Sequence, residues 1–303
     1  MKILVLGAGV IGSLYAAKLH DAGEDVTLFA RGSRYDQLRS GSVSLRDAST
    51  GRVTFRRVPV TGELGPSDGY ELIIISVRLD QLAPVLDLVR RHTAHPLILC
   101  MCNNPDGVDE LAASLAPRKV IFGFPGAGGA RVGDTIRFLM IPRQKTTLGT
   151  SDGRLSGELQ RVKALLETAG FKTAATTRIG AWLRVHAVFM SAVSAAICQA
   201  GGDAARLGSD KKAVAGMVKA VREGFRACLQ LGVPIVPSNL KTIFLTVPRW
   251  FSIRYWQGAL KGPTGTLAMA PHATAAPGEM RLIAQKVLSF VHSSSVATPT
   301  LDH

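Results

Sequence analysis

Residues 1–178 alternate between short apolar runs and segments of helical periodicity. The apolar runs have strand length and carry few polar residues, which is typical of strands buried on both faces of a sheet. Alternating strands and helices predict a mainly parallel sheet with right-handed crossovers. We expect strands at 2–6, 26–30, 43–45, 53–58, 72–77, 97–101, 120–122, 135–140, 146–148 and 172–175, and helices at 79–90, 108–115 and 155–169.

The pattern changes at Ile179. Long helical patterns follow and no convincing strand remains, so we expect an all-helical second domain. The helical patterns cover 182–200, 211–231 and 279–293. Residues 247–276 are rich in Pro, Gly and small side chains, which predicts a long irregular segment. The chain is therefore expected to form two domains, at 1–178 and 179–303.

A glycine motif follows the first apolar run. Gly7, Gly9 and Gly12 stand between that run and an Ala-rich helical pattern, and a second apolar run comes next. Strand, glycine turn, helix and strand is the order that a dinucleotide-binding fingerprint requires, with free N–H groups at the helix start for a pyrophosphate. This predicts a Rossmann-type doubly wound sheet. The residues expected to contact the cofactor here are Gly7, Ala8, Gly9, Val10, Ile11 and Gly12.

The end of the second strand indicates which dinucleotide is bound. An acidic residue at this point would hold the ribose hydroxyls of NAD, but the chain has Arg31, Ser33 and Arg34. Two guanidinium groups and a hydroxyl suit a 2′-phosphate, so we expect NADP(H). The alternative is that both arginines are ordinary surface charges.

The charge of the chain favours anionic ligands. The 303 residues carry a formal net charge of +14, yet Lys and Arg are dispersed and no nucleic-acid module is recognisable. We therefore expect a small anionic substrate and no nucleic-acid partner. The apolar stretch 187–200 is interrupted by serines and is judged too short to span a bilayer, so no membrane is expected either.

The cysteines and histidines do not predict a metal site. The four cysteines lack ligand spacing, which fits thiols in a reducing cytoplasm. His186, His272 and His292 also lack such spacing and are expected to be surface or satisfied side chains.

Taken together, these features resemble the ketopantoate reductase (2-dehydropantoate 2-reductase) family. The resemblance rests on the glycine fingerprint followed by Arg31, an Asn after the fourth buried strand, and a Trp-containing helix that opens the helical domain. The closing stretch 297–302 and Glu279, about twenty positions earlier, are also similar to that family. The resemblance implies an NADP-dependent oxidoreductase of pantothenate biosynthesis, and it allows a homodimer.

The resemblance also assigns site residues by position. The family's general-acid Lys falls on Arg184, its two following Asn residues fall on Val188 and Ala192, and its Glu, which orients the substrate hydroxyl, falls on Glu279. A Lys after the third buried strand corresponds to Arg78, and the cofactor-side Asn corresponds to Asn103 or Asn104. The family's late Ser has no secure counterpart, although Thr264 and Thr266 lie nearby.

The departures from the family pattern change the expected chemistry. Arg184 can supply charge and anchor a carboxylate, but with a pKa above about 12 it is a poor proton donor near neutrality. Val188 and Ala192 share its helix face and would make that wall of the site more apolar. Arg184 could instead be a solvated helix charge, and Glu279 a helix-start carboxylate favoured by the macrodipole.

The sequence hypothesis is an NADPH-dependent reductase that converts a small 2-oxo acid into the 2-hydroxy acid in an interdomain cleft. Reduction of 2-dehydropantoate itself is a narrower claim. Two alternatives remain open: a reductase of a bulkier, more apolar carbonyl or imine, and a non-catalytic NADP(H)-binding sensor.

Overall fold

The chain folds into two compact units, and each is described by itself. The computed structural model describes residues 1–302. The first unit comprises residues 1–102 and 108–179, and the second comprises 103–107 together with the chain from 180 onward. The short segment 103–107 therefore belongs to the helical unit. The sequence pattern does not indicate this assignment.

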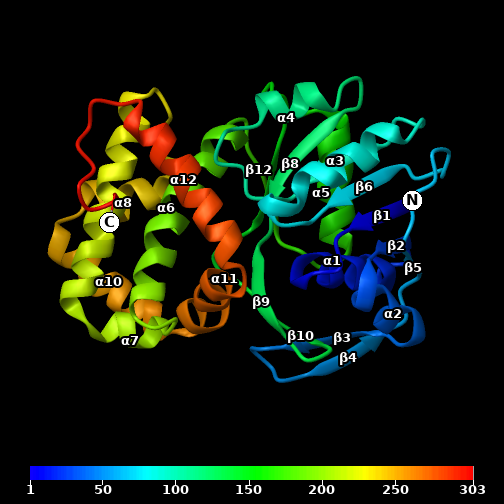
Figure 1. The fold of residues 1–303 in the computed structure, drawn as a ribbon, viewed down its shortest axis with the longest axis horizontal. Helices are drawn as coiled ribbons and strands as arrows, with labels where there is room; N and C mark the ends of the chain where they lie inside the picture. The colour runs from blue at the N-terminus through cyan, green and yellow to red at the C-terminus, as the bar shows by residue number, and fades with distance from the viewer. Residues whose placement is uncertain (303) are drawn as a thin grey trace. The chain divides into compact units, whose positions relative to one another are not determined.

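A mainly parallel eight-stranded sheet forms the centre of the first unit (Figure 1). Its strand order is β12-β11-β8-β7-β6-β1-β2-β5, and its neighbouring strands are parallel except for β11 and β8. This confirms the predicted α/β fold class. The strands are β1 (Lys2–Leu6), β2 (Asp25–Phe29), β5 (Val60–Thr61), β6 (Leu72–Ile75), β7 (Leu97–Cys100), β8 (Val120–Phe124), β11 (Thr146–Gly149) and β12 (Thr173–Ala175).

The apolar runs become the buried strands of this sheet. Residues 3–6 of β1 and all of β6 have no solvent exposure, because other strands and helices cover both of their faces. The helical elements of this unit are α1 (Val10–Asp21), α2 (Gly32–Ser40), η1 (Leu79–Gln81), α3 (Leu82–Arg91), α4 (Asp109–Ser114) and α5 (Gly157–Thr168). Helix α2 begins directly after Arg31 and is not predicted from the sequence.

A second sheet of the first unit is also absent from the sequence prediction. Its order is β4-β3-β10-β9, formed by β3 (Val43–Asp47), β4 (Val53–Arg56), β9 (Ala127–Val132) and β10 (Thr135–Met140). Strand β9 lacks an apolar run, which hides it from pattern analysis. Its Gly129 has a φ of +154°, and a Cβ there would lie 2.1 Å from the Arg137 carbonyl oxygen, so the close pairing with β10 requires glycine.

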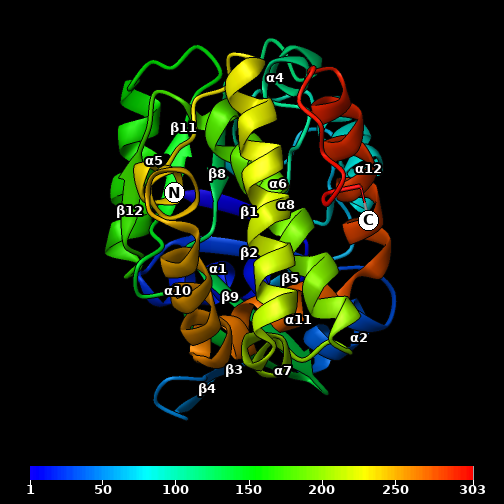
Figure 2. The ribbon, with the colours of Figure 1, turned by 90° about the vertical axis from the view of Figure 1, so that its left-hand side faces the viewer.

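The second unit is helical, as predicted, and Figure 2 shows α8 facing the viewer with α10 and α12 on either side. The long helices α6, α8 and α12 match the three predicted helical patterns. The elements are α6 (Ile179–Gln199), α7 (Ala204–Ser209), α8 (Lys211–Gln230), α9 (Ser238–Lys241), η2 (Thr242–Thr246), α10 (Arg249–Lys261), η3 (Thr264–Met269), α11 (Ala270–Ala275) and α12 (Pro277–His292).

The expectation of an irregular segment at 247–276 is wrong. Residues 249–275 are almost entirely helical, with a π-helical stretch between α10 and α11. The prolines here stand at helix starts, where a missing N–H costs nothing. Gly265 packs against the Leu260 backbone, where a Cβ would lie only 2.1 Å from the carbonyl oxygen. Trp256 is buried, whereas Trp250, Phe251 and Tyr255 are exposed.

The expectation that the apolar stretch 187–200 is too short to span a bilayer does not hold for helix α6, which is longer. It contains 21 residues and is apolar enough to cross a membrane by length and composition alone. However, 61% of its most apolar window is buried among other parts of the protein, as in the core helix of a globular unit. Burial, not length, therefore distinguishes this helix from a membrane span.

The C-terminal segment is attached to α8 through the buried Glu223. Its carboxylate accepts hydrogen bonds from the Thr300 N–H at 2.8 Å, the Thr300 hydroxyl at 2.9 Å and the Leu301 N–H at 3.1 Å. Removing this carboxylate would leave donors without their partner, so the contact stabilises the fold of the second unit.

Replacing Glu223 by Ala is expected to lower the free energy of unfolding of the second unit by about 3 kcal/mol, because several charge-assisted hydrogen bonds disappear. Urea titration followed by tryptophan fluorescence measures this, since all three tryptophans lie in this unit. Lys219→Gln is the control, because Lys219 is half exposed and 3.7 Å from Glu223 and should cost under about 1 kcal/mol. Equal losses of unfolding free energy in Glu223→Ala and Lys219→Gln would contradict the stabilising role given to the Glu223 carboxylate.

Candidate active site

The turn after β1 can be built only with glycine at two positions. Gly7 has a φ of +114°, and a Cβ there would lie 2.5 Å from the Ser76 carbonyl oxygen. A Cβ on Gly12 would lie 1.8 Å from the Gly7 carbonyl oxygen. These contacts correspond to the tight turn and the close helix packing that the fingerprint assigns to the two positions.

Gly9 differs from both neighbours, because open space surrounds it. No atom lies within 4 Å of the position that a Cβ would take, and Gly9 is the N-cap of α1. The first turn of α1 carries no acidic side chain, and the N–H groups of Val10, Ile11 and Gly12 belong to the helix start. An uncrowded backbone with a positive helix end fits the pyrophosphate of a dinucleotide.

Arg34 braces this glycine turn. Its side chain is buried and donates hydrogen bonds to the Ala8 carbonyl oxygen at 3.3 Å, to Gln37 Oε1 at 2.6 Å and to Ser13 Oγ at 3.4 Å. Burial lowers the pKa of this guanidinium, and nearby Arg131 lowers it further. The structure thus gives Arg34 a structural role that the sequence does not indicate, and its phosphate contact stays a prediction.

Arg31 and Ser33 remain available to a ligand. Both are exposed, with Arg31 as the N-cap of α2 and Ser33 in its first turn. Arg131 of β9, which sequence analysis missed, adds a further positive charge near Arg34. Arg78 follows β6 and forms an ion pair with Asp80, with 3.2 Å between Nε and Oδ1. Its contact with the nicotinamide stays a prediction.

The second unit contains a buried bond between two of the predicted site residues. The Asn103 amide donates to Glu279 Oε1 at 3.0 Å, and both residues are buried although they lie 176 positions apart. Glu279 stands in the first turn of α12, where the helix dipole favours a negative charge. Asn103 is the first residue of segment 103–107, which explains why this segment belongs to the helical unit.

Arg184 of α6 also binds segment 103–107. Its Nε donates to the Pro105 carbonyl oxygen at 3.1 Å, and its Nη2 donates to the Asp106 carbonyl oxygen. The guanidinium also lies 4.7 Å above the Phe290 ring centroid. Lys286 of α12 reaches the Asp106 carboxylate at 2.5 Å. Two helices therefore hold the segment that carries Asn103.

Val188 and Ala192 are core residues in the structure. Both are buried, and Val188 packs on α8, where its Cγ1 would lie 2.5 Å from a Cβ placed on Gly224. Helix α6 thus turns Arg184 toward segment 103–107 and Val188 toward α8. The sequence interpretation of Val188 and Ala192 as substrate-side residues stays a prediction.

Two histidines that the sequence did not favour are linked electrostatically to Glu279, His272 directly and His186 through His272. His186 stacks on Trp182, with 5.2 Å between ring centroids, and burial together with His272 lowers its pKa to about 3. Burial also lowers the pKa of His272, while the Glu279 carboxylate opposes that shift. No spacing rule links these residues, so sequence reasoning had no signal for the group that we call the Glu279 cluster: Asn103, His186, His272 and Glu279.

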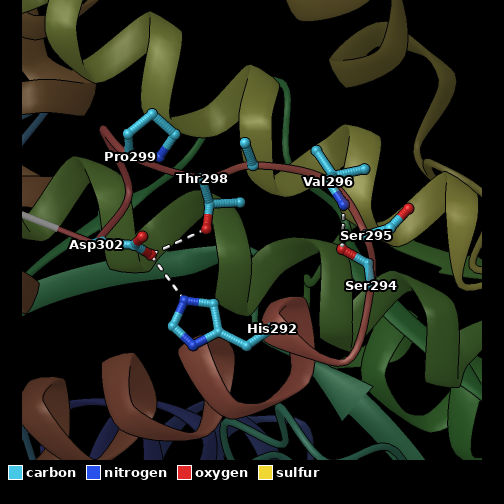
Figure 3. Close-up of a pocket in the computed structure, with 8 residues that line it drawn as sticks. His292, Ser294, Ser295, Val296, Thr298, Pro299 and Asp302 are labelled. Atoms are coloured by element: carbon cyan, nitrogen blue, oxygen red, sulfur yellow. Dashed lines mark hydrogen bonds and ion pairs between the residues drawn. The ribbon is translucent and has the colours of Figure 1, made fainter.

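A pocket of about 430 Å³ lies at the C-terminal end of α12 (Figure 3). His292 Nε2 is 2.9 Å from Asp302 Oδ1, and the same oxygen accepts a hydrogen bond from the Thr298 hydroxyl. These side chains pair with one another and hold the C-terminal segment, so we assign them a structural role. Among residues 1–302, no group of three or more His, Cys, Asp or Glu side chains could hold a metal ion.

Comparison with known proteins identifies the family. The family model for ketopantoate reductase PanE/ApbA matches residues 3–153, which contain the glycine turn and segment 103–107. The chain belongs to the ketopantoate reductase family. Its members are oxidoreductases that act on a carbonyl. A 2-dehydropantoate 2-reductase from Archaeoglobus fulgidus is 28% identical over 65% of this chain, and the alignment spans 64% of that relative's length.

Solved structures of two oxidoreductases have the same fold. D-Mandelate dehydrogenase with NADH and anilino(oxo)acetate has a TM-score of 0.78 at 17% identity, covering 100% of this chain and 95% of that one. A dimeric ketopantoate reductase from Staphylococcus aureus has a TM-score of 0.69 at 14% identity, with 100% and 95% coverage. At these identities the likeness shows the fold alone, and the family membership supports a nicotinamide cofactor.

Substituting Gly9 or Gly12 by Ala should separate binding from folding. Gly9→Ala adds a methyl group in open space, so the melting temperature should stay unchanged while affinity for NADPH falls by at least ~10-fold. Gly12→Ala forces the turn and α1 apart and should lower the melting temperature by several degrees. Calorimetric titration and thermal unfolding measure the two effects. Wild-type cofactor affinity in Gly9→Ala would contradict the pyrophosphate site.

Proposed function

We propose that the chain is an NADPH-dependent reductase of the ketopantoate reductase type that converts a small 2-oxo acid, such as 2-dehydropantoate, into the 2-hydroxy acid. The observation that carries this proposal is the buried Asn103–Glu279 hydrogen bond in the second unit. Burying a carboxylate is costly for stability alone, and a buried carboxylate in a fixed orientation suits the binding of a substrate hydroxyl.

The cofactor supplies a hydride to the carbonyl carbon when it is bound. The residues that would hold it are those of the glycine turn, with Gly9 facing the pyrophosphate. Arg31 and Ser33 would bind the 2′-phosphate, aided by the N–H groups at the start of α2. Arg34 contributes indirectly by bracing Ala8, and Arg78 would border the nicotinamide.

The substrate side would use Arg184, Glu279 and Asn103. Arg184 Nη1 takes part in neither of the two bonds to segment 103–107, so it would bind the substrate carboxylate while Nε and Nη2 hold the backbone. Glu279 would accept a hydrogen bond from a substrate hydroxyl. Asn103 keeps the Glu279 carboxylate in one orientation.

The two alternatives from the sequence lose their support. The preference for a bulkier, more apolar substrate rested on Val188 and Ala192, and Val188 is packed against α8. The non-catalytic alternative rested on the missing Lys and Asn residues. The Glu279 cluster supplies other polar groups in the same unit.

We also propose that the enzyme is cytoplasmic and forms a homodimer. The four cysteines are free thiols, which suits a reducing compartment. The exposed Trp250, Phe251 and Tyr255 of α10 are residue types that are enriched at protein interfaces.

Replacing Arg31 by Ala should remove the preference for the phosphorylated cofactor. We expect NADPH affinity to fall about 10- to 100-fold, the value of a charge-assisted contact, while NADH affinity stays within twofold. Calorimetric titration with both cofactors measures this. Arg39→Ala is the matched control, because Arg39 is an exposed arginine of the same helix that stacks on Tyr35. Equal losses for NADPH and NADH would contradict the 2′-phosphate role.

Replacing Arg184 by Met should impair reduction of 2-oxo acids without weakening cofactor binding. The variant loses the carboxylate anchor and the bonds to segment 103–107, so kcat/KM should fall about 100-fold or more. NADPH oxidation measured with a panel of 2-oxo acids gives the effect. Arg281→Met, an exposed residue of α12, should retain wild-type rates. A parallel loss of NADPH affinity would count against the role given to Arg184.

A further inference from the structure

The proposed reaction needs a proton donor that the assigned residues do not supply. Hydride transfer to a carbonyl places negative charge on oxygen, and a positioned acid accelerates this step. A guanidinium is a poor proton donor near neutrality, and Arg184 Nε and Nη2 already bind backbone carbonyl oxygens. Arg184 can stabilise charge, but it is not suited to supply the proton. The donor must be sought elsewhere.

His272 has the surroundings of such a donor. It lies in α11, which packs against η3 and α12. Its ring is half-buried, and its Nε2 is fully buried without a hydrogen-bond partner among residues 1–302. A buried ring nitrogen without a partner is costly, which marks a position where a bound ligand or water would complete the hydrogen bonding. Glu279, the substrate-orienting residue of the proposed function, interacts with it electrostatically.

Glu279 is well placed to support a charged imidazole. Asn103 holds its carboxylate at 3.0 Å, and segment 103–107 is in turn fixed by Arg184 and Lys286. A carboxylate beside a histidine stabilises the imidazolium form, as in many acid–base pairs. The same carboxylate that would orient the substrate therefore also favours the proton-bearing form of His272.

We propose that His272, supported by Glu279, donates the proton to the carbonyl oxygen of the substrate. This inference rests on the proposed function. The hydride from the cofactor forms the new C–H bond, and the π electron pair of the C=O bond moves to oxygen. That oxygen takes a ring N–H proton from the His272 imidazolium. The substrate is reduced, the cofactor is oxidised, and the neutral imidazole regains a proton from solvent.

The charged groups around His272 determine how the rate depends on pH. Element η3 carries no titratable side chain, Glu279 is the group of α12 that acts on His272, and His186 approaches from α6. The exposed Arg281 also lies on α12. His186, with a pKa of about 3, stays neutral above pH 5 and cannot account for a change of rate there. Because burial lowers the pKa of His272 below 6.5, reduction should slow as pH rises through that lowered value.

The experiment compares kcat for NADPH-dependent reduction of a 2-oxo acid between pH 4.5 and 8 in wild type, His272→Gln and His292→Gln. Wild-type kcat should fall about tenfold per pH unit on the basic side of the His272 pKa. His272→Gln should be about 100-fold slower at the acidic end and lack this fall. His292→Gln should match wild type, because His292 pairs with Asp302 at the far end of α12.

The outcomes separate the two proposals. If the wild type fails to oxidise NADPH with every 2-oxo acid tested, at every pH, the proposed function is overturned and this inference with it. If the wild type is active, and His272→Gln keeps the same pH profile with a kcat within twofold of wild type, only the role of His272 is overturned.

A second measurement on wild type covers the case in which His272→Gln fails to fold. In NMR titrations of the histidine ring protons with NADP⁺ bound, oxamate as a carbonyl analogue should raise the pKa of His272 and leave the His292 signals unaffected. An unchanged His272 titration overturns the inference.

Discussion

The burial of the Glu279 carboxylate is the constraint on which the second unit's site depends. A carboxylate taken from water is costly unless nearby dipoles and donors replace its hydration. Here the start of α12 and the Asn103 amide supply that replacement, and His272 interacts with the carboxylate electrostatically. Each of them must be held in place, and this requirement explains why segment 103–107 departs from the first unit. Arg184 and Lys286, which would otherwise be surface charges, fix that segment.

The first unit satisfies a different constraint, which is steric. Gly7 and Gly12 let three pieces of backbone approach more closely than any side chain would allow, and the space left around Gly9 is the result. Arg34 then ties the turn to α2, so the shape of the proposed anion site and the position of Arg31 are linked through one buried guanidinium. Arg34 thus shapes the proposed site, whereas Arg31 is exposed at its edge.

Local patterns sufficed to predict most of the α/β unit. The buried runs 72–77 and 97–101 correspond to β6 and β7, and the glycine spacing predicts the tight turn after β1. Pattern analysis failed where structure comes from tertiary contact. Strand β9 has no apolar run. The irregular segment predicted at 247–276 is helical instead, because its prolines and glycines stand at helix starts and close contacts.

The site shows the same division between local and long-range information. Family resemblance located Glu279 and Asn103, but nothing local predicts their hydrogen bond across 176 positions. The sequence also described His272 as a surface or satisfied residue, because proximity to Glu279 depends on the packing of α11 against α12. The most direct test of the account is a crystal structure with NADP⁺ and oxamate. We predict the 2′-phosphate on Arg31 and the oxamate within hydrogen-bond distance of Glu279 and His272, whereas oxamate bound away from Glu279 would contradict it.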